Sequence, residues 1–285
     1  MAAVVHVNGK ILTEEHATVS VFDHGFLFGE GIYETLRTYQ RRPFLLDRHL
    51  ARLRHSASLM ALDVPFSDED LGRRVNETMA AHPALDEAYI RILLTRGVGD
   101  LSYSLSATPT PSLVIIVKPF VPHPERAFTH GIPVVVVGVR RNHPDALNPM
   151  IKSNNLLNNA LAMQEALRRG GQEALMLNQA GQIAECSQSN VFLVRRGEVV
   201  TPPLSAGLLP GITREYVLEL AADLKIPARE TQIGLDDLEA ADEAFLTGTT
   251  REVTPVVTVD GRAVGDGRPG AITRRLLDAF RGKCT

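Results

Sequence analysis

Apolar and polar residues alternate with a period of two over residues 88–97, which predicts a β-strand. One face of this strand is apolar and would lie in a core, whereas Tyr89 and Arg91 stand together on the opposite face. By pattern alone, that second face meets either water or a cleft. Short β-branched and aromatic runs predict further strands in this half of the chain, at 4–7, 19–22, 33–39 and 112–120.

Apolar residues spaced by three and four predict two helices in the same half. The first would be capped by Asp47 and would run to about Leu62. Ser67 with Asp70 three residues later is a capping-box-like start for the second helix, whose Leu71 would face inward. We therefore predict a sheet combined with helices for the first part of the chain.

The stretch 121–127 carries two prolines among polar residues, which is typical of a linker. Beyond it we predict a strand at 132–139 and a helix from about Ser153 to Arg169, ended by Gly170 in a left-handed cap. The remaining pattern predicts hairpins at 175–185, 191–201 and 257–264, a strand at 243–250, and helices at 212–224 and 271–280. The fold class is thus a two-domain α/β (α+β) protein, with a small domain at 1–120, a linker at 121–127 and a large domain at 128–285.

Composition bounds the function. The 285 residues hold 30 lysines and arginines against 33 aspartates and glutamates, a net charge of -3 that does not suit nucleic-acid binding. No apolar run approaches the roughly 20 residues of a membrane helix, and no targeting peptide is visible, so we expect a cytoplasmic protein. Most of the paired arginines are interpreted as solvated surface, the two cysteines as free thiols, and the scattered histidines predict no metal site.

Three segments of the second half could carry chemistry. Lys152 follows apolar residues that would favour a neutral, nucleophilic amine, although a lone lysine is more often a surface charge. Glu185 precedes polar residues that alone would be interpreted as turn formers. Gly211-Ile212-Thr213 leads into a helix, whose first N–H groups either bind an anion or are simply capped.

These segments, in this order and followed by Thr247-Gly248-Thr249-Thr250, resemble the class IV (fold type IV) pyridoxal-phosphate aminotransferases, and the similarity spans nearly the whole chain. The resemblance implies pyridoxal 5′-phosphate at the domain interface, with Lys152 as the Schiff-base lysine and Glu185 keeping the pyridine nitrogen protonated. It also implies a set of residues that hold the cofactor: Arg52, Lys152, Glu185, Leu209, Gly211, Ile212, Thr213, Gly248 and Thr249.

The same resemblance implies the substrates. Tyr89-Ile90-Arg91 is similar to the tyrosine-x-arginine strand of the branched-chain enzymes, which implies ping-pong transfer from a branched-chain L-amino acid to 2-oxoglutarate. The implied substrate residues are Phe28, Tyr33, Tyr89, Arg91, Thr249 and Thr250. Leu156 and Phe28 stand where those enzymes commonly have tyrosine, which leaves a D-amino acid or (R)-amine transaminase open. An aminodeoxychorismate lyase and a non-catalytic anion-binding protein are further alternatives.

The family also implies the protein's partners. Its members are dimers whose active sites borrow a loop from the neighbouring subunit, and Gly99–Ala107 is the matching stretch here. We therefore expect a homodimer or higher homo-oligomer that binds small amino acids and keto acids. Cys186, next to Glu185, either affects the cofactor or merely fills space.

Overall fold

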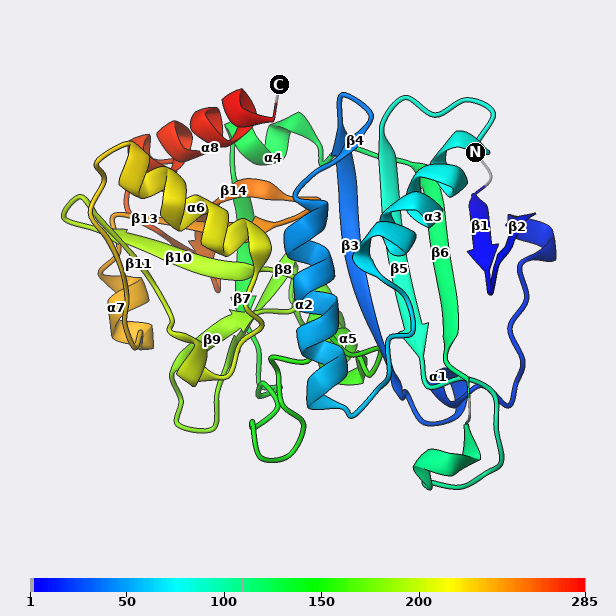
Figure 1. Ribbon diagram of the computed structural model, residues 1–285. Helices are drawn as coiled ribbons and strands as arrows, with labels where there is room; N and C mark the ends of the chain where they lie inside the picture. Colours follow the sequence, from blue (N-terminus) through cyan, green and yellow to red (C-terminus); the bar gives the residue numbers. More distant parts are fainter. Residues whose placement is uncertain (1–2, 109, 285) are drawn as a thin grey trace. The chain divides into compact units, whose positions relative to one another are not determined.

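The chain divides into two compact units in the computed structural model, which describes residues 3–108 and 110–284 (Figure 1). Unit 1 comprises Met1–Val121 together with Ile151–Asn155, and unit 2 comprises Pro122–Met150 together with Leu156–Thr285. The short segment Ile151–Asn155 thus clusters with unit 1, although it lies within the stretch 128–285.

Unit 1 is built on a six-stranded antiparallel sheet with the strand order β2-β1-β6-β5-β3-β4. The prediction of a strand at 19–22 is wrong: these residues form a loop and turn before helix α1 (His24–Leu27), and Val19, Val21 and Phe22 are all more than half exposed. The segment takes part in none of the backbone strand pairs that build the sheet, so its β-branched and aromatic pattern is not sufficient to make it a strand. The strands are β1 (Val4–Val7), β2 (Lys10–Thr13), β3 (Gly31–Tyr39), β4 (Arg42–Pro43), β5 (Ala88–Thr95) and β6 (Ser112–Pro119).

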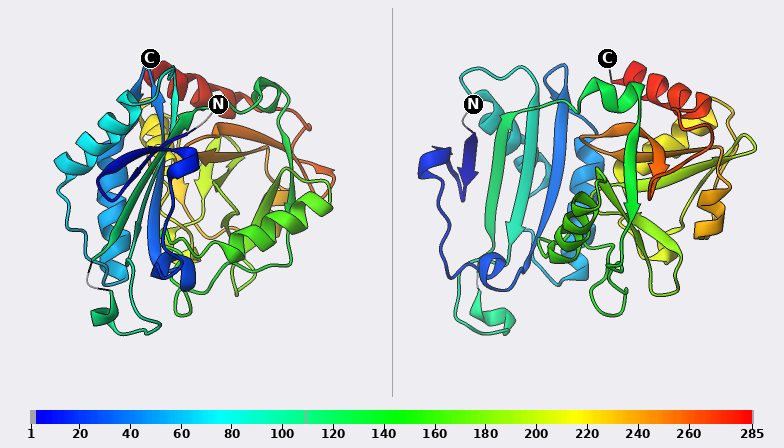
Figure 2. Two further views of the ribbon diagram at one scale, coloured as in Figure 1. Left: turned by 90° about the vertical axis from the view of Figure 1, so that its right-hand side faces the viewer. Right: turned by 180° about the vertical axis from the view of Figure 1, so that it is seen from behind.

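Helices α2 (Leu46–Leu59) and α3 (Asp68–Ala80) pack on one face of this sheet (Figure 1). The alternation in β5 is confirmed, because Ile90, Ile92 and Leu94 are at most 1% exposed and lie in one cluster with Leu53 and Val75 of the two helices. The opposite face of the sheet, seen from behind in Figure 2, carries the tyrosines and arginines of β3 and β5.

The start of α3 is as predicted, since the Ser67 hydroxyl accepts a hydrogen bond from the Asp70 N–H at 3.0 Å. Two predictions for α2 are wrong. Asp47 lies inside the first turn, because the chain enters the helix through Leu45 with a left-handed φ of 52°. The helix also ends at Leu59, before the expected 62, because the N–H groups of residues 60–62 turn back to carbonyls of the last turn.

Unit 2 is built on a nine-stranded mixed sheet with the order β12-β11-β10-β13-β14-β7-β8-β9, in which β15 pairs with β14. β7 runs parallel to β8 and β14, β11 runs parallel to β12, and the other pairs are antiparallel, including the three predicted hairpins. The strands are β7 (Ile132–Val136), β8 (Glu173–Leu177), β9 (Ile183–Cys186), β10 (Asn190–Arg195), β11 (Glu198–Thr201), β12 (Ala228–Glu230), β13 (Glu243–Gly248), β14 (Glu252–Val259) and β15 (Arg262–Ala263).

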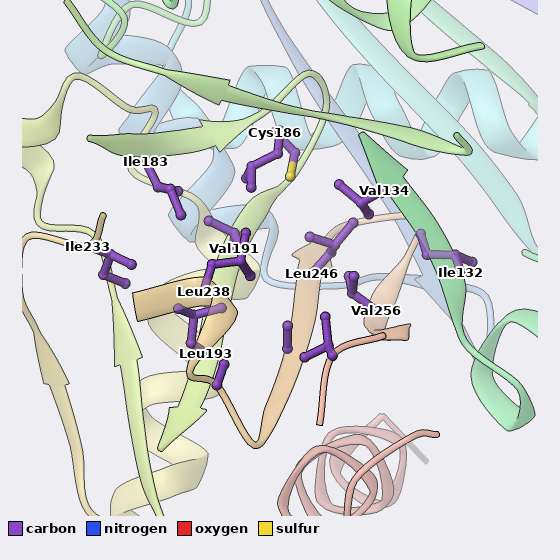
Figure 3. Close-up of a cluster of buried hydrophobic side chains, with 14 of the residues drawn as sticks. Ile132, Val134, Ile183, Cys186, Val191, Leu193, Ile233, Leu238, Leu246 and Val256 are labelled. Atoms are coloured by element: carbon purple, nitrogen blue, oxygen red, sulfur yellow. The ribbon is translucent and has the colours of Figure 1, made fainter. Parts of the chain in front are cut away.

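One hydrophobic cluster forms the main core of unit 2 (Figure 3). It joins strands that are far apart in the sheet order, among them Val134 of β7, Ile183 of β9, Val191 of β10 and Leu246 of β13. Since side chains of one face meet in a single cluster, the sheet curves around them. Helix α5 (Leu157–Arg168) covers the other face of β7 and β8, and the remaining helices are α4 (Glu125–Thr129), α6 (Ile212–Asp223), α7 (Leu235–Glu239) and α8 (Ala271–Lys283).

The helix expected from about Ser153 begins only at Leu157, because Ser153 is extended and forms an isolated bridge with Ile32 of β3. Its end is as predicted, with Gly170 in the left-handed region at a φ of 81°. Across residues 3–108 and 110–284, no helix combines the length and the apolar character that are needed to cross a membrane.

Candidate active site

Lys152 is fixed by backbone hydrogen bonds to unit 1. Its carbonyl oxygen accepts from the Tyr33 N–H of β3 at 2.9 Å, and its own N–H donates to the Ser56 hydroxyl of α2 at 3.1 Å. The neighbouring Ser153 bridges to Ile32. The backbone of Lys152 is therefore held by hydrogen bonds to both a strand and a helix, and its side chain takes no part in either bond.

Two basic side chains lie close to the ring of Tyr33. The Lys152 Nζ is 4.5 Å from the ring centroid and the Arg91 Cζ is 4.1 Å from it. Arg91 reaches the ring because it pairs with Thr35, two residues beyond Tyr33 on the neighbouring strand. Its Nε is buried and has no hydrogen-bond partner among the described residues. Three of the predicted site residues therefore meet here, and they could bind an anion or orient an amine.

Tyr89 lies nearer the other end of the same face, and not beside Tyr33. It pairs with Arg37 across β3 and β5, and the Lys118 Nζ is 5.0 Å from its ring. Arg37 was missed by the sequence analysis; its guanidinium lies 3.9 Å from the Tyr39 ring centroid and 3.8 Å from that of Phe120. The period of two in β3 could have indicated it, because Arg37 follows Tyr33 by four residues.

Arg52 is oriented by a buried carboxylate. Its Nε and Nη2 donate to the two oxygens of Glu34 at 2.8 and 2.7 Å, and the His49 Nδ1 lies 2.7 Å from one of these oxygens. Glu34 is 0% exposed, which by itself raises its pKa, but the charge and hydrogen bonds of Arg52 and His49 outweigh burial and lower the pKa to about 2. Burial also lowers the pKa of His49. Glu34 therefore remains a carboxylate that fixes the guanidinium of Arg52.

Phe28, a predicted substrate residue, belongs to a contact between two loops of unit 1. Its ring packs edge-on against His24 at 4.9 Å and lies 5.0 Å from Tyr103. The loops are also joined by backbone, because the His24 N–H donates to the Gly97 carbonyl at 2.9 Å. Gly97 has a φ of 100°, and a Cβ there would collide with the Thr110 carbonyl, so only glycine suits this close approach. The loop 99–107 is thus anchored at its base.

In unit 2, Glu185 is a buried carboxylate whose two oxygens both accept hydrogen bonds. The Arg141 Nε donates to Oε1 at 2.6 Å, and Oε2 accepts from the Leu209 N–H at 3.1 Å and the Asn190 side chain at 3.2 Å. Arg141 also donates to Asn158 of α5. Most of the paired arginines are interpreted as solvated surface, and Arg141 is an exception: it is 8% exposed and forms an ion pair with Glu185. The guanidinium of Arg141 therefore lies directly against the Glu185 carboxylate.

The predicted anion site lies at the start of α6 in the same unit. Gly211 is the residue before the first helical turn, and no side chain caps the helix. The N–H groups of Ile212 and Thr213 therefore begin a helix of 12 residues without an internal acceptor. A Cβ on Gly211 would collide with the Asn190 side-chain oxygen, so the glycine keeps this helix end close to the amide that contacts Glu185.

Thr249, Thr250 and Arg251 form the turn between Gly248, the last residue of β13, and β14, and the Arg251 N–H closes this turn by donating to the Gly248 carbonyl at 3.1 Å. Arg251 pairs with the fully buried Glu173 at 3.4 Å. This ion pair fixes the turn against β8, so the backbone groups of the two threonines are held in place.

Cys186 is 1% exposed and is part of the hydrophobic cluster in Figure 3. Burial, with the nearby Glu173 carboxylate, raises the pKa of its thiol well above the ordinary value. Its structural role is therefore to fill space in the core. Within the described ranges, no three or more histidine, cysteine or acidic side chains are grouped to hold a metal ion.

Known proteins resemble this chain along its whole length. A family model described as "Amino-transferase class IV" matches residues 31–259. A "Putative branched-chain-amino-acid aminotransferase" of Methanocaldococcus jannaschii is 39% identical over 277 residues, or 97% of this chain and 95% of that protein. A D-alanine aminotransferase of Listeria monocytogenes is 35% identical over 279 residues, 97% and 94% respectively. The crystal structure of a branched-chain aminotransferase from Thermoproteus uzoniensis with norvaline superposes with a TM-score of 0.92 at 36% identity, covering 100% of this chain and 95% of that one.

Proposed function

The chain belongs to the class IV aminotransferase family, and we propose that it transfers the amino group of a branched-chain L-amino acid to 2-oxoglutarate with pyridoxal 5′-phosphate as cofactor. The names of the archaeal relative and of the superposed crystal structure support this substrate class. The observation that carries the proposal is that Lys152 and Arg91 both lie close to the ring of Tyr33.

The described residues fit pyridoxal phosphate on three counts. The uncapped start of α6 at Ile212 and Thr213 suits a phosphate dianion, and within unit 1 Arg52 has an oriented guanidinium, which is also suited to a phosphate. Glu185 is a buried carboxylate that pairs with Arg141. A protonated pyridine nitrogen requires such an acceptor for its N–H. Lys152 offers the amine to which the cofactor attaches. When bound, the cofactor supplies a ring that withdraws electrons from the reacting carbon.

Lys152 and Glu185 have different roles in this chemistry: the lysine transfers protons, and the glutamate interacts with the ring nitrogen. The Lys152 Nζ accepts the proton of the donor's α-carbon and returns one to the product, acting as general base and then acid. Glu185 holds its negative charge at the ring nitrogen because Arg141, Asn190 and the Leu209 N–H satisfy its oxygens and fix its direction. The side chain of Leu209, whose N–H makes this contact, would pack against the ring of the bound cofactor.

The remaining predicted residues select the substrate. Arg91 is oriented by its contact with Tyr33 and supplies a fixed cation for a substrate carboxylate. The turn of Thr249 and Thr250 offers backbone N–H groups for a second carboxylate contact. Tyr89, opposite Arg37, contributes to the same face farther from the lysine, and Phe28 contributes an apolar wall.

A D-amino acid transaminase is the second candidate. It is supported by the 35% identity to the Listeria D-alanine aminotransferase and by Leu156, which stands where the branched-chain enzymes commonly have a tyrosine. The presence of Arg91 on β5 favours the branched-chain substrate, because the D-amino acid enzymes lack an arginine there.

The test is a half-reaction on the purified holoenzyme without keto acid. Absorbance of the bound cofactor is followed after addition of L-leucine, D-alanine or (R)-1-phenylethylamine, in the wild type and in Lys152→Ala. We expect the band to bleach fastest with L-leucine in the wild type and to respond to none of the amines in the variant. Faster bleaching by either of the other amines would refute the branched-chain substrate, and bleaching of the band in Lys152→Ala at the wild-type rate would refute the role of the lysine.

We further propose a homodimer that forms through an apolar patch of unit 1, defined here as the 22–26/101–105 patch. It comprises Phe22, Phe26, Leu101, Tyr103 and Leu105, which are between 52% and 82% exposed. The two segments lie side by side, because the Gly99 N–H donates to the Phe22 carbonyl at 3.2 Å. Several large exposed apolar side chains on one surface are typical of a protein interface.

A further inference from the structure

Unit 1 contains a cavity of about 510 Å³ that the proposed reaction does not use. It lies between the turn that joins β1 to β2, helix α3 and the residues that precede β6, and its lining includes none of the residues assigned above to cofactor or substrate. Its volume is that of a site for a small organic molecule.

His6 presents a buried donor at this cavity. The Arg74 Nη1 lies 3.1 Å from the His6 Nε2, and because a guanidinium can only donate, that nitrogen accepts and the ring proton sits on Nδ1. Burial, followed by the Arg74 charge, lowers the pKa of His6, which agrees with a neutral ring. The residue is 2% exposed, and its Nδ1 has no hydrogen-bond partner among the described residues. A buried N–H without an acceptor is unfavourable, so a ligand oxygen there would be stabilising.

Arg74 supplies a second donor. Its Nε donates to Asp70 at 2.8 Å and its Nη1 donates to His6, while its side chain remains 21% exposed. Asn8 adds a third donor, because its side-chain oxygen already accepts from the Leu113 N–H at 2.8 Å, which leaves its NH₂ group for a ligand. The polar part of the lining is therefore rich in donors and, within residues 3–108 and 110–284, contains no carboxylate, and Asp70, which does not line the cavity, is paired with Arg73 and Arg74.

The rest of the lining is apolar. Phe66 lies under the Arg74 guanidinium, with 5.1 Å between the Arg74 Cζ and the ring centroid, and Leu113, Val98 and Pro111 complete the wall. A ligand that fills the cavity must therefore join an acceptor-rich head to an apolar body. Asp70 offsets part of the Arg74 charge, which favours a single negative charge over a phosphate dianion.

We propose that this cavity is a binding site for a small monocarboxylate with an aromatic or branched aliphatic body. Its carboxylate oxygens accept from Arg74, the His6 Nδ1–H and the Asn8 amide, and its body packs on Phe66 and Leu113. Val98 and Thr110, which also line the cavity, stand at the two ends of the loop 99–107, so the ligand contacts both ends of that loop. The proposal is independent of the proposed reaction.

The test uses 4-bromobenzoate as the probe and the complete holoenzyme. Crystals are soaked in the probe, and the bromine is located by its anomalous signal. In solution, binding is measured by calorimetry for the wild type, for Arg74→Gln, and for Arg73→Gln as the matched control. Arg73 is next to Arg74 on α3 and also pairs with Asp70, but it does not line the cavity.

We expect a bromine peak in the cavity and binding that Arg74→Gln weakens at least about tenfold, since a hydrogen bond to a charged group is commonly worth that factor. Arg73→Gln should bind as the wild type does. The proposal is overturned if no bromine is found in the cavity, or if the two variants bind the probe equally well. The wild-type soak decides the matter even if Arg74→Gln does not fold.

Discussion

Glu34→Gln tests how much the buried pair of Glu34 and Arg52 stabilises unit 1. The substitution keeps the shape of the side chain but mimics its protonated form. A pKa lowered from 4.5 to about 2 stabilises the ionised form in the folded protein by about 3 kcal/mol near neutral pH, because each pKa unit corresponds to about 1.4 kcal/mol. Glu34→Gln should therefore lower the free energy of unfolding by about 3 kcal/mol, and by more if the Arg52 charge is left without a partner.

The effect should depend on pH in one direction. Because the folded pKa is below the unfolded one, the stabilisation is complete above about pH 4.5 and is lost as the pH falls toward about 2. Urea unfolding followed by circular dichroism, at neutral pH and at about pH 3.5, measures it. The difference in the free energy of unfolding between the wild type and Glu34→Gln should fall to about 2 kcal/mol at the lower pH.

Glu77→Gln is the control, because Glu77 pairs with Arg73 on the surface of α3 and is 48% exposed. It should change stability little at either pH, since exposed pairs contribute little. A Glu34→Gln variant as stable as the wild type at neutral pH would refute the reasoning, as would a difference that grows on acidification. The folded variant should also bind pyridoxal phosphate more weakly, because Arg52 loses the group that orients it.

Two further predictions address the other unit and the assembly. Gly211→Ala places a Cβ against the Asn190 side-chain oxygen at the start of α6. The apparent Kd for pyridoxal phosphate, measured by absorbance titration, should therefore rise about tenfold. Gly282→Ala is the control, because a Cβ at this position of α8 meets no other atom, and it should leave the Kd unchanged. Leu101→Lys in the 22–26/101–105 patch should halve the mass measured by light scattering, whereas Leu167→Lys on α5 should not; an unchanged mass for Leu101→Lys would contradict the proposed interface.

Local patterns in the chain determined much of both units. The period of two in β5 predicted its buried face, because alternate side chains of a strand point to opposite sides. The Ser67 cap was predictable because the hydroxyl and its N–H partner are three residues apart. The candidate chemistry at Lys152, Glu185 and Gly211 was found through the order of short motifs, which is a property of the sequence alone.

Tertiary structure decided which side chains support these residues. Arg141 and Glu185 are separated by 44 positions, and Glu34 and Arg52 by 18, so no local period relates either pair. A buried carboxylate without a cationic partner is strongly unfavourable, and the arrangement of the sheet and helices determines which arginine lies close enough to pair with it. The start of α5 was misplaced for a similar reason: Ser153 forms a β-bridge with Ile32, and Lys152 and Asn154 form backbone hydrogen bonds with β3, so long-range contacts outweigh the local preference for a helix.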